Sequence, residues 1–170
     1  HRGIGGAAGE ISHMAVDGVS VISCTCGVPN CLESVASGGA LVASLRAQGF
    51  EAETAPDVVA LGARGEPVAL DALREAGMLI GQALAGVVNF FNPREVVLAG
   101  SMSASLPLVA AIRAELFQRC LPLVARDLEV RATRNPQVAG LRGATLLVLD
   151  EVLAPARIDS LLKDTDVRTA

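Results

Sequence analysis

Aromatic residues are scarce in this sequence, which has no Trp, no Tyr and four Phe among 170 residues. Surfaces that hold nucleic-acid bases or sugars by stacking are built from aromatic side chains, so this scarcity argues against one. Apolar residues nevertheless make up 51% of the chain, which is enough for a core and too much for a disordered protein. We therefore expect a folded domain with an aliphatic core of Ala, Val and Leu.

An excess of positive charge, a membrane-spanning run and a leader sequence are missing as well. The net charge is −4, so the chain by itself is not expected to bind DNA. No apolar run reaches the roughly 18 residues that a membrane span needs, and residues 1–6 lack the apolar stretch of a signal peptide. These absences predict a cytoplasmic protein without membrane contact, whose cysteines bind metal or stay as thiols.

The chain begins without Met inside a glycine-rich stretch, which predicts a fragment of a longer protein. Its length suits one domain or two small lobes. We expect a hairpin arm with a zinc-binding cysteine loop over residues 1–37, an α/β lobe over 38–154, and a C-terminal helix with a frayed tail over 155–170.

Apolar residues recur every three or four positions in several segments, and stretches rich in Gly and Pro separate these segments. The predicted helices cover residues 32–49, 68–91, 107–119, 141–153 and 155–162, with one short helix inside the linker 50–67. Apolar runs predict strands at 95–99 and 128–132. Helices that alternate with strands through short connections indicate a parallel sheet and an α/β fold. In the longest helix, Gly77 and Gly81 lie four residues apart and would let another backbone pack closely.

Three cysteines and one histidine stand close together near the start of the chain. Cys24, Cys26 and Cys31 fall within eight positions, and His13 lies eleven residues before Cys24. Three thiolates and an imidazole are a common tetrahedral ligand set for zinc, because the thiolates neutralise the cation. Four protein ligands leave no position open for catalysis, so the predicted zinc site is structural.

Other interpretations of these residues remain open. Buried Cys is common in aliphatic cores, and a lone His is more often an ordinary side chain. A redox pair is typically Cys-x-x-Cys, a spacing that this sequence lacks. We expect Cys120, which stands apart from the others, to pack in the core, and His1 to be inert.

Two carboxylates flank the cysteine cluster. Glu10 lies three residues before His13, and Glu33 lies two residues after Cys31. If a metal ion holds both segments, Glu10, His13 and Glu33 converge on one pocket edge, where their polar atoms suit the neighbouring hydroxyls of a sugar. The alternative is that Glu33 only offsets a helix macrodipole and that Glu10 is a solvated loop acid.

Four segments together resemble a known family. They are Gly6-Ala7-Ala8-Gly9-Glu10-Ile11-Ser12-His13, then Cys24-x-Cys26-Gly27-x-x-x-Cys31-Leu32-Glu33 with Ala36-Ser37, then Asn89 to Leu98, and Ala139-Gly140-Leu141-Arg142-Gly143-Ala144. They resemble the ROK family of repressors, open reading frames and sugar kinases. The resemblance implies the C-terminal lobe of an actin-like ATPase (ribonuclease H-like) fold with a small zinc-binding loop. It also implies that His13, Cys24, Cys26 and Cys31 bind zinc, and that Glu10, His13 and Glu33 contact sugar hydroxyls.

Departures from the family pattern bear on the choice between regulator and kinase. The resemblance implies that a kinase carries a catalytic Asp and an Asp-x-Gly phosphate motif on a first lobe, which this chain lacks. It also implies a Gly-Gly-Gly-like turn near the nucleotide, where the chain has Ala99-Gly100-Ser101-Met102. Gly100 and Ser101 are therefore a weak nucleotide turn that the bulky Met102 would crowd. Ser12 replaces the family's usual Gly and leaves the ligand and pocket residues in place.

We therefore expect the sugar-sensing effector lobe of a ROK-type transcriptional regulator. Residues 119–128 and 149–155 are more similar to actinobacterial-type repressors than to kinases. The expected partners are a sugar or sugar derivative, DNA through an upstream domain, and further copies of the chain. The rivals are the C-terminal lobe of a sugar kinase that transfers phosphate from ATP to a hexose, a zinc-stapled module that binds a protein, and a metal-free redox protein.

Overall fold

A computed structural model describes residues 2–17, 22–135 and 138–166, so the expectation for His1 lies outside the described residues. The elements, in chain order, are α1 (Leu32–Ala36), α2 (Gly38–Ala47), α3 (Ala55–Ala63), α4 (Pro67–Phe91), β1 (Glu95–Leu98), the 3₁₀ helix η1 (Ser101–Ala104), α5 (Leu106–Arg119), α6 (Pro122–Ala125), β2 (Glu129–Ala132), α7 (Ala139–Val152) and α8 (Pro155–Asp166).

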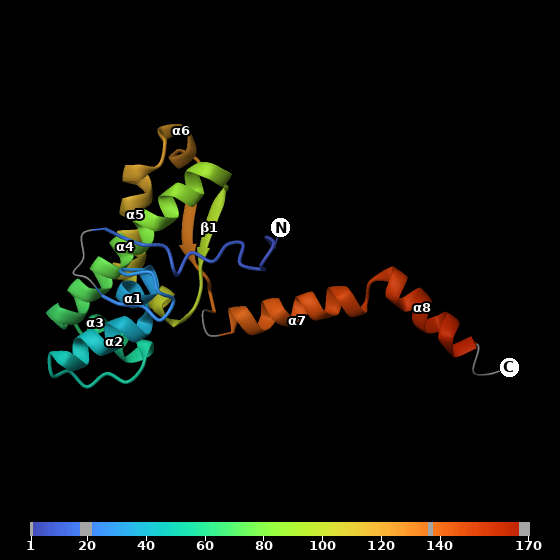
Figure 1. Ribbon diagram of the computed structural model, residues 1–170, viewed down its shortest axis with the longest axis horizontal. Coiled ribbons are helices and arrows are strands. Elements are labelled where there is room, and N and C mark those ends of the chain that lie inside the picture. Colours follow the sequence, from blue (N-terminus) through green and yellow to red (C-terminus); the bar gives the residue numbers. More distant parts are fainter. Residues whose placement is uncertain (1, 18–21, 136–137, 167–170) are drawn as a thin grey trace.

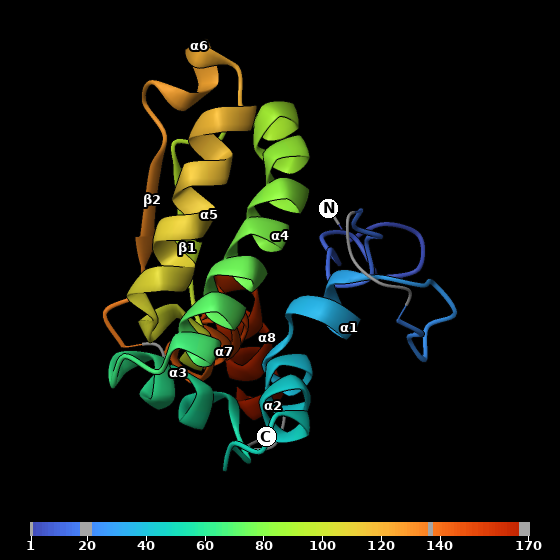
Figure 2. The same cartoon turned by 90° about the vertical axis from the view of Figure 1, so that its left-hand side faces the viewer.

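The two strands form a parallel sheet, as the alternation of helices and strands predicts. β1 and β2 pair in register along their whole length, from Glu95 opposite Glu129 to Leu98 opposite Ala132. Helices α4 and α5 lie on one face of this sheet (Figure 2). Val130 is buried on that face, so the core of the lobe lies between the helix pair and the strands.

The pair α4 and α5 packs at very short range. A Cβ atom at Gly77 would lie 2.6 Å from the backbone oxygen of Leu108, and one at Gly81 would lie 2.5 Å from the Cβ of Glu115. Glycine is the residue that lets two helix backbones approach this closely, so the predicted role of the two glycines is confirmed. Buried aliphatic side chains fill the contact around them, among them Leu73, Val88, Ile112 and Leu116.

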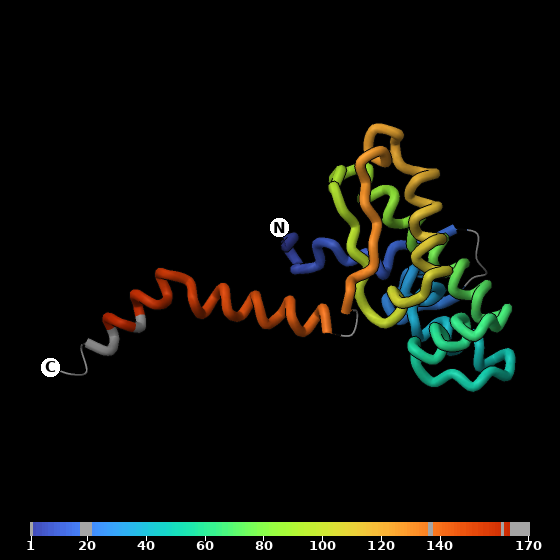
Figure 3. Tube along the Cα trace, turned by 180° about the vertical axis from the view of Figure 1, so that it is seen from behind, coloured from blue at the N-terminus to red at the C-terminus, as the bar shows by residue number. Residues whose placement is uncertain are grey.

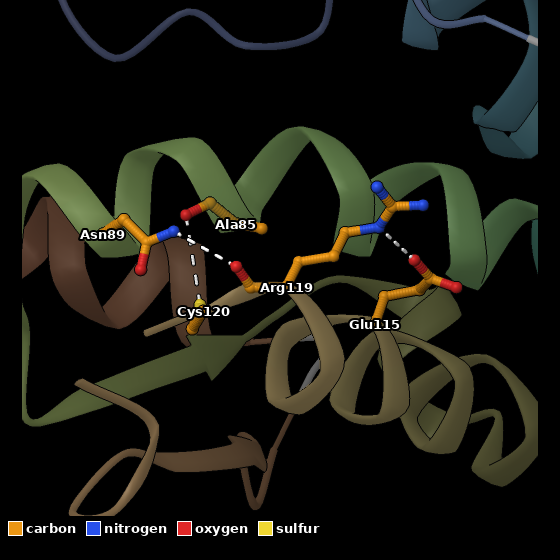
Figure 4. Close-up of polar contacts among 5 residues, drawn as sticks. All are labelled: Ala85, Asn89, Glu115, Arg119 and Cys120. Atoms are coloured by element: carbon orange, nitrogen blue, oxygen red, sulfur yellow. Dashed lines mark hydrogen bonds and ion pairs between the residues drawn. The ribbon is translucent and has the colours of Figure 1, made fainter. Parts of the chain in front are cut away.

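Hydrogen bonds join the C-terminal ends of these two helices (Figure 4). The Asn89 amide nitrogen donates to the carbonyl of Arg119 at 3.4 Å, and its Oδ1 accepts from the Leu121 N–H at 2.9 Å. The Cys120 thiol, directly after α5, donates to the carbonyl of Ala85 in α4 at 3.9 Å. Burial raises the pKa of Cys120, which is the buried core cysteine that the sequence predicts.

One predicted helix is divided in two. The sequence predicts a single helix over 32–49, but the chain turns out of the helical region at Ser37, where φ is −72° and ψ is 159°. The Ser37 hydroxyl accepts a hydrogen bond from the Ala40 N–H at 3.1 Å. Serine is a preferred residue at the N-cap of a helix. Its side-chain hydrogen bond therefore ends α1 and begins α2, although the apolar spacing continues.

The short elements α6 and η1 were not predicted, because segments of four residues are too short to show a hydrophobic period.

The hairpin arm expected before the cysteine loop contains no strand in the residues that the structure describes there. Ala15 and Cys31 form an isolated antiparallel bridge, and residues 18–21 lie outside the described ranges. The linker 50–67 holds α3, whose N-terminus has the capping box formed by Thr54 and Asp57. Hydrogen bonds from Thr54 and from the Glu53 N–H lower the pKa of Asp57.

The last two helices project from the rest of the lobe (Figures 1 and 3). None of the described residues of α7 is buried, although many of them are large and apolar. Those most exposed on α7 include Leu141, Leu146, Leu147 and Val148. A helix that is apolar on several sides is ordinarily covered by other parts of a protein. Among the described residues, no helix combines the length and the apolar character of a membrane span.

Candidate metal centre

Two short segments, residues 12–16 and 30–33, lie side by side at the start of α1 and place His13 next to Cys31. Three backbone hydrogen bonds join them, from the Val16 N–H to the Asn30 carbonyl, from the Leu32 N–H to the Met14 carbonyl and from the Glu33 N–H to the Ser12 carbonyl, at 2.9, 3.0 and 2.7 Å. Cys31 is the residue immediately before α1, and its side chain is buried. The position of Cys31 is therefore fixed by the N-terminus of α1.

The structure brings together all four residues that the sequence proposes as metal ligands. One ligand atom from each of His13, Cys24, Cys26 and Cys31 lies within 4.8 Å of the others. The Nδ1 atom of His13 is 3.6 Å from the sulfur of Cys31 and 3.8 Å from that of Cys24. The sulfurs of Cys26 and Cys31 are 4.0 Å apart.

These separations suit a single tetrahedral zinc ion. With zinc bonds of about 2.3 Å to sulfur and about 2.0 Å to nitrogen, two sulfurs lie roughly 3.8 Å apart and a sulfur and a nitrogen roughly 3.5 Å apart. The three shortest separations given above, 3.6, 3.8 and 4.0 Å, exceed these values only slightly. The donor set of three thiols and one imidazole is therefore chemically and geometrically able to hold zinc, with no open position for a reacting water.

The turn after Cys24 depends on backbone geometry that glycine adopts easily. Gly27 has a φ of 86°, and its N–H donates to the Cys24 carbonyl at 3.0 Å. The next N–H, that of Val28, points to the sulfur of Cys26 at 3.4 Å. An N–H directed at sulfur stabilises a thiolate, which is the form that binds a metal.

The electrostatics of the cluster favour a charged pair of His13 and Cys31. Burial raises the pKa of Cys31, but hydrogen bonds from His13, Cys24 and Ser34 outweigh burial and lower the pKa to about 6. The hydrogen bond with Cys31 raises the pKa of His13. For Cys26, the Val28 N–H lowers the pKa, while burial and the two neighbouring thiols raise it more. The cluster therefore holds a thiolate near neutral pH even before a cation is considered.

Both candidate sugar-binding acids are hydrogen-bonded to Ser12, the residue before His13, Glu10 through its carboxylate and Glu33 through its backbone N–H. The charges of Glu10 and Glu33 both contribute to the raised pKa of His13. Glu10 is exposed, and its Oε1 accepts from the Ser12 N–H at 2.9 Å. The Ser12 side chain and this N–H together lower the pKa of Glu10. Glu33 is exposed in the first turn of α1. Glu10, His13 and Glu33 thus belong to the same pair of segments. The structure is also compatible with the alternative interpretation, in which Glu10 is an exposed loop acid and Glu33 offsets the macrodipole of α1.

The turn after β1 is open at Gly100. Gly100 has a φ of 85°, and no atom lies within 4 Å of the place that its Cβ would occupy. Met102 was expected to crowd this turn, but its side chain packs against the core beside Gly38. The buried Ser103 hydroxyl donates to the Gly100 carbonyl at 2.7 Å. Gly100 and Ser101 follow the end of β1 at Leu98. They lie at the carboxyl end of a parallel strand, where α/β proteins commonly bind ligands.

Asn30 belongs to the candidate site and was not singled out from the sequence. It has a φ of 53°, and its side chain accepts from the Ile22 N–H at 2.7 Å. Asn is among the residues that tolerate left-handed backbone geometry. Its place directly before a ligand cysteine was the signal that could have identified it.

Comparison with known proteins establishes the family. The model of the ROK family matches residues 1–151, and the chain belongs to the ROK family. It is 30% identical to the xylose repressor of Bacillus spizizenii over 154 residues, which are 90% of this chain and 40% of the repressor.

Two solved structures share the fold. A ROK family glucokinase from Streptomyces griseus, in complex with glucose and AMPPNP, matches with a TM-score of 0.70 and 28% identity, over 86% of this chain and 53% of that one. A ROK family transcriptional regulator, a homologue of the Escherichia coli MLC protein, matches with a TM-score of 0.66 and 28% identity, over 72% of this chain and 33% of that one. The predicted fold class, that of the actin-like ATPases, is confirmed. The chain spans 40% of the length of the xylose repressor.

Proposed function

We propose that this chain is the sugar-sensing lobe of a cytoplasmic ROK-type transcriptional regulator. His13, Cys24, Cys26 and Cys31 hold a structural zinc ion, and the ion fixes the segments that carry Glu10, His13 and Glu33. A sugar or sugar derivative binds to these three side chains and to a second lobe. Its binding changes how the lobes close, and a DNA-binding domain outside these residues responds. The proposal rests on one observation, the convergence of four metal-ligand atoms on two paired segments that also carry Glu10 and Glu33.

The donors and acceptors at the site suit sugar hydroxyls. The Nδ1 atom of His13 faces the sulfurs of Cys24 and Cys31. When a metal occupies Nδ1, the neutral imidazole carries its proton on Nε2, which becomes a hydrogen-bond donor of fixed direction. The carboxylates of Glu10 and Glu33 are acceptors. One donor between two acceptors suits neighbouring hydroxyl groups, each of which both donates and accepts.

The relatives and the charge of the chain favour a regulator. The xylose repressor is similar over 90% of this chain. The net charge of −4 is unsuited to DNA phosphates, so the proposed DNA contact belongs to a separate domain. Self-association into dimers or larger assemblies is part of the same proposal.

The test is a calorimetric titration of the natural, zinc-loaded protein with xylose, glucose and N-acetylglucosamine. We expect one of these classes of sugar to bind and Glu33→Gln to weaken it by roughly tenfold or more, because a hydrogen bond to a charged group is lost. Zinc content is expected to stay unchanged. The matched control is Glu51→Gln, which changes an exposed acid near α3 and should leave the affinity as it is. Equal affinity in the Glu33 and Glu51 variants would contradict the proposed sugar site.

The second candidate is a sugar kinase of the same family. The open turn at Gly100 and the TM-score of 0.70 to a glucokinase favour it. The two candidates differ in one simple assay, the sugar-dependent consumption of ATP by the natural protein. Turnover of ATP that follows the sugar concentration would establish the kinase, and its absence together with sugar binding supports the regulator.

A further inference from the structure

Asn30 makes contacts that connect both segments of the metal centre. Its N–H donates to the Ile22 carbonyl at 2.9 Å, and its side-chain Oδ1 accepts from the Ile22 N–H at 2.7 Å. Its own carbonyl accepts from the Val16 N–H at 2.9 Å. The backbone N–H, the backbone carbonyl and Oδ1 of Asn30 are therefore all engaged with residues that are distant in the sequence.

The two bonds between Asn30 and Ile22 close the cysteine loop. Ile22 lies two residues before Cys24, and Asn30 lies one residue before Cys31. Between these anchors the chain must bring the sulfurs of Cys24 and Cys26 back towards Cys31. Loop closure reduces the conformational freedom of the intervening residues, so metal binding has less ordering left to do.

The third bond connects the closed loop to the histidine. Val16 lies three residues after His13, and the bond from its N–H to Asn30 is part of the pairing that sets His13 beside Cys31. One residue therefore connects the segment that holds the imidazole with the loop that holds the thiols. Loss of the Oδ1 bond would loosen the Ile22 end of the loop and leave the Val16 contact in place.

We propose that Asn30 is a positioning residue that keeps the bound metal from leaving, through the hydrogen bond between its Oδ1 and the Ile22 N–H. This inference rests on the proposed function, because it requires that the cluster holds zinc. The bond closes the loop around the thiols, and an open loop lets a thiolate leave the ion more often. Groups that orient metal ligands from outside the coordination shell typically change metal affinity by 10- to 100-fold.

A purely conformational role is the alternative explanation for Asn30. A φ of 53° favours Gly or Asn at this position. If only the turn mattered, Gly would serve as well as Asn. The substitution Asn30→Gly separates the two roles, because Gly adopts the same φ without strain and lacks Oδ1. Asn30→Asp is the complementary variant, since it keeps an acceptor oxygen at the same position.

The experiment measures zinc release from the zinc-loaded protein into an excess of a chromogenic chelator by stopped-flow absorbance. We expect Asn30→Gly to release zinc roughly tenfold faster than the wild type, and Asn30→Asp to stay within about threefold of it. Asn92→Gly is the matched control. Asn92 is also an Asn with positive φ, 46°, but it ends α4, so its substitution should leave the release rate unchanged.

Hydrogen exchange at the Ile22 amide gives a second readout that does not depend on metal release. We expect this amide to exchange faster in Asn30→Gly than in the wild type and in Asn92→Gly. Equal release rates and equal exchange in the wild type and Asn30→Gly would overturn the role of Asn30 and leave the zinc site intact. A wild-type protein that binds no zinc would overturn the metal centre itself, and the role of Asn30 with it.

Discussion

Two cysteines of this chain have the same side chain and different chemistry because their surroundings differ. Cys31 is next to His13, Cys24 and Ser34, and hydrogen bonds with these neighbours outweigh burial and lower its pKa to about 6. Cys120 is surrounded by the apolar contact of α4 and α5, and burial raises its pKa. A thiolate binds metal and a buried neutral thiol does not. The two residues therefore form a matched pair for testing the metal site.

We expect Cys31→Ser to reduce the zinc content of the purified protein from one ion per chain to none. Serine has nearly the same size, but its hydroxyl is a poor zinc ligand beside thiolates. Cys120→Ala should keep the full zinc content and lower the stability by about 1 kcal/mol, because it leaves a small cavity. Elemental analysis and thermal unfolding check both results. Retention of zinc by Cys31→Ser would exclude Cys31 as a ligand.

Among the elements, α4 shows how position along a helix decides what a glycine does. Gly77 lies against α5 with no space for a Cβ atom, whereas nothing lies within 4 Å of the place of a Cβ at Gly86. Gly86 is exposed. By helix propensity both residues weaken α4, although the spacing of Gly77 and Gly81 already predicts close packing at the first. Only the packing of α5 on one side of α4 makes the first necessary and the second replaceable.

We expect opposite effects from the same substitution at these two positions. Gly77→Ala should lower the free energy of unfolding by about 1–3 kcal/mol, because its methyl group would overlap Leu108 and Ala111. Gly86→Ala should raise it by roughly 0.5–1 kcal/mol, because Ala restricts the unfolded chain and favours the helix. Urea unfolding of the zinc-loaded protein measures both. A loss of stability in Gly86→Ala would contradict this account of α4.

The molecule as a whole exposes strand edges and large apolar side chains in the described residues. The Arg113 guanidinium donates to the Val130 carbonyl at 2.8 Å and 2.5 Å, which occupies part of the β2 edge. In the described residues, β1 has no strand partner other than β2, and Val97 on the outer face of the sheet is 46% exposed. The apolar helix α7 also projects from the rest of the molecule, and none of its described residues is buried. Open strand edges and apolar faces promote association.

We therefore expect the 170-residue chain, when studied alone, to form dimers or larger species as its concentration increases. Replacing Leu141 and Val148 of α7 with Glu should shift it towards the monomer, because charge on the exposed apolar side opposes contact between copies. Arg142→Glu on the same helix is the control, since it changes charge without removing apolar area. Size-exclusion chromatography with light scattering gives the mass. A wild-type chain that stays monomeric at every concentration would contradict the expectation.

Local chemistry and residue spacing were enough to predict several features of this protein. The helical period predicts α4, short apolar runs predict β1 and β2, and three cysteines with one histidine identify the residues that meet in the cluster. These inferences hold because period and ligand chemistry are properties of neighbouring residues.

Features that depend on contacts between distant segments of the chain became visible only in the folded structure. One local feature was also missed, the break at Ser37, because its hydrogen bond to the nearby Ala40 N–H competes with the helical period. Asn30 gains its place through hydrogen bonds to Ile22 and Val16, and Glu33 comes near His13 because its N–H donates to the carbonyl of Ser12. No local pattern encodes such contacts, since each depends on where the folded chain places its second partner.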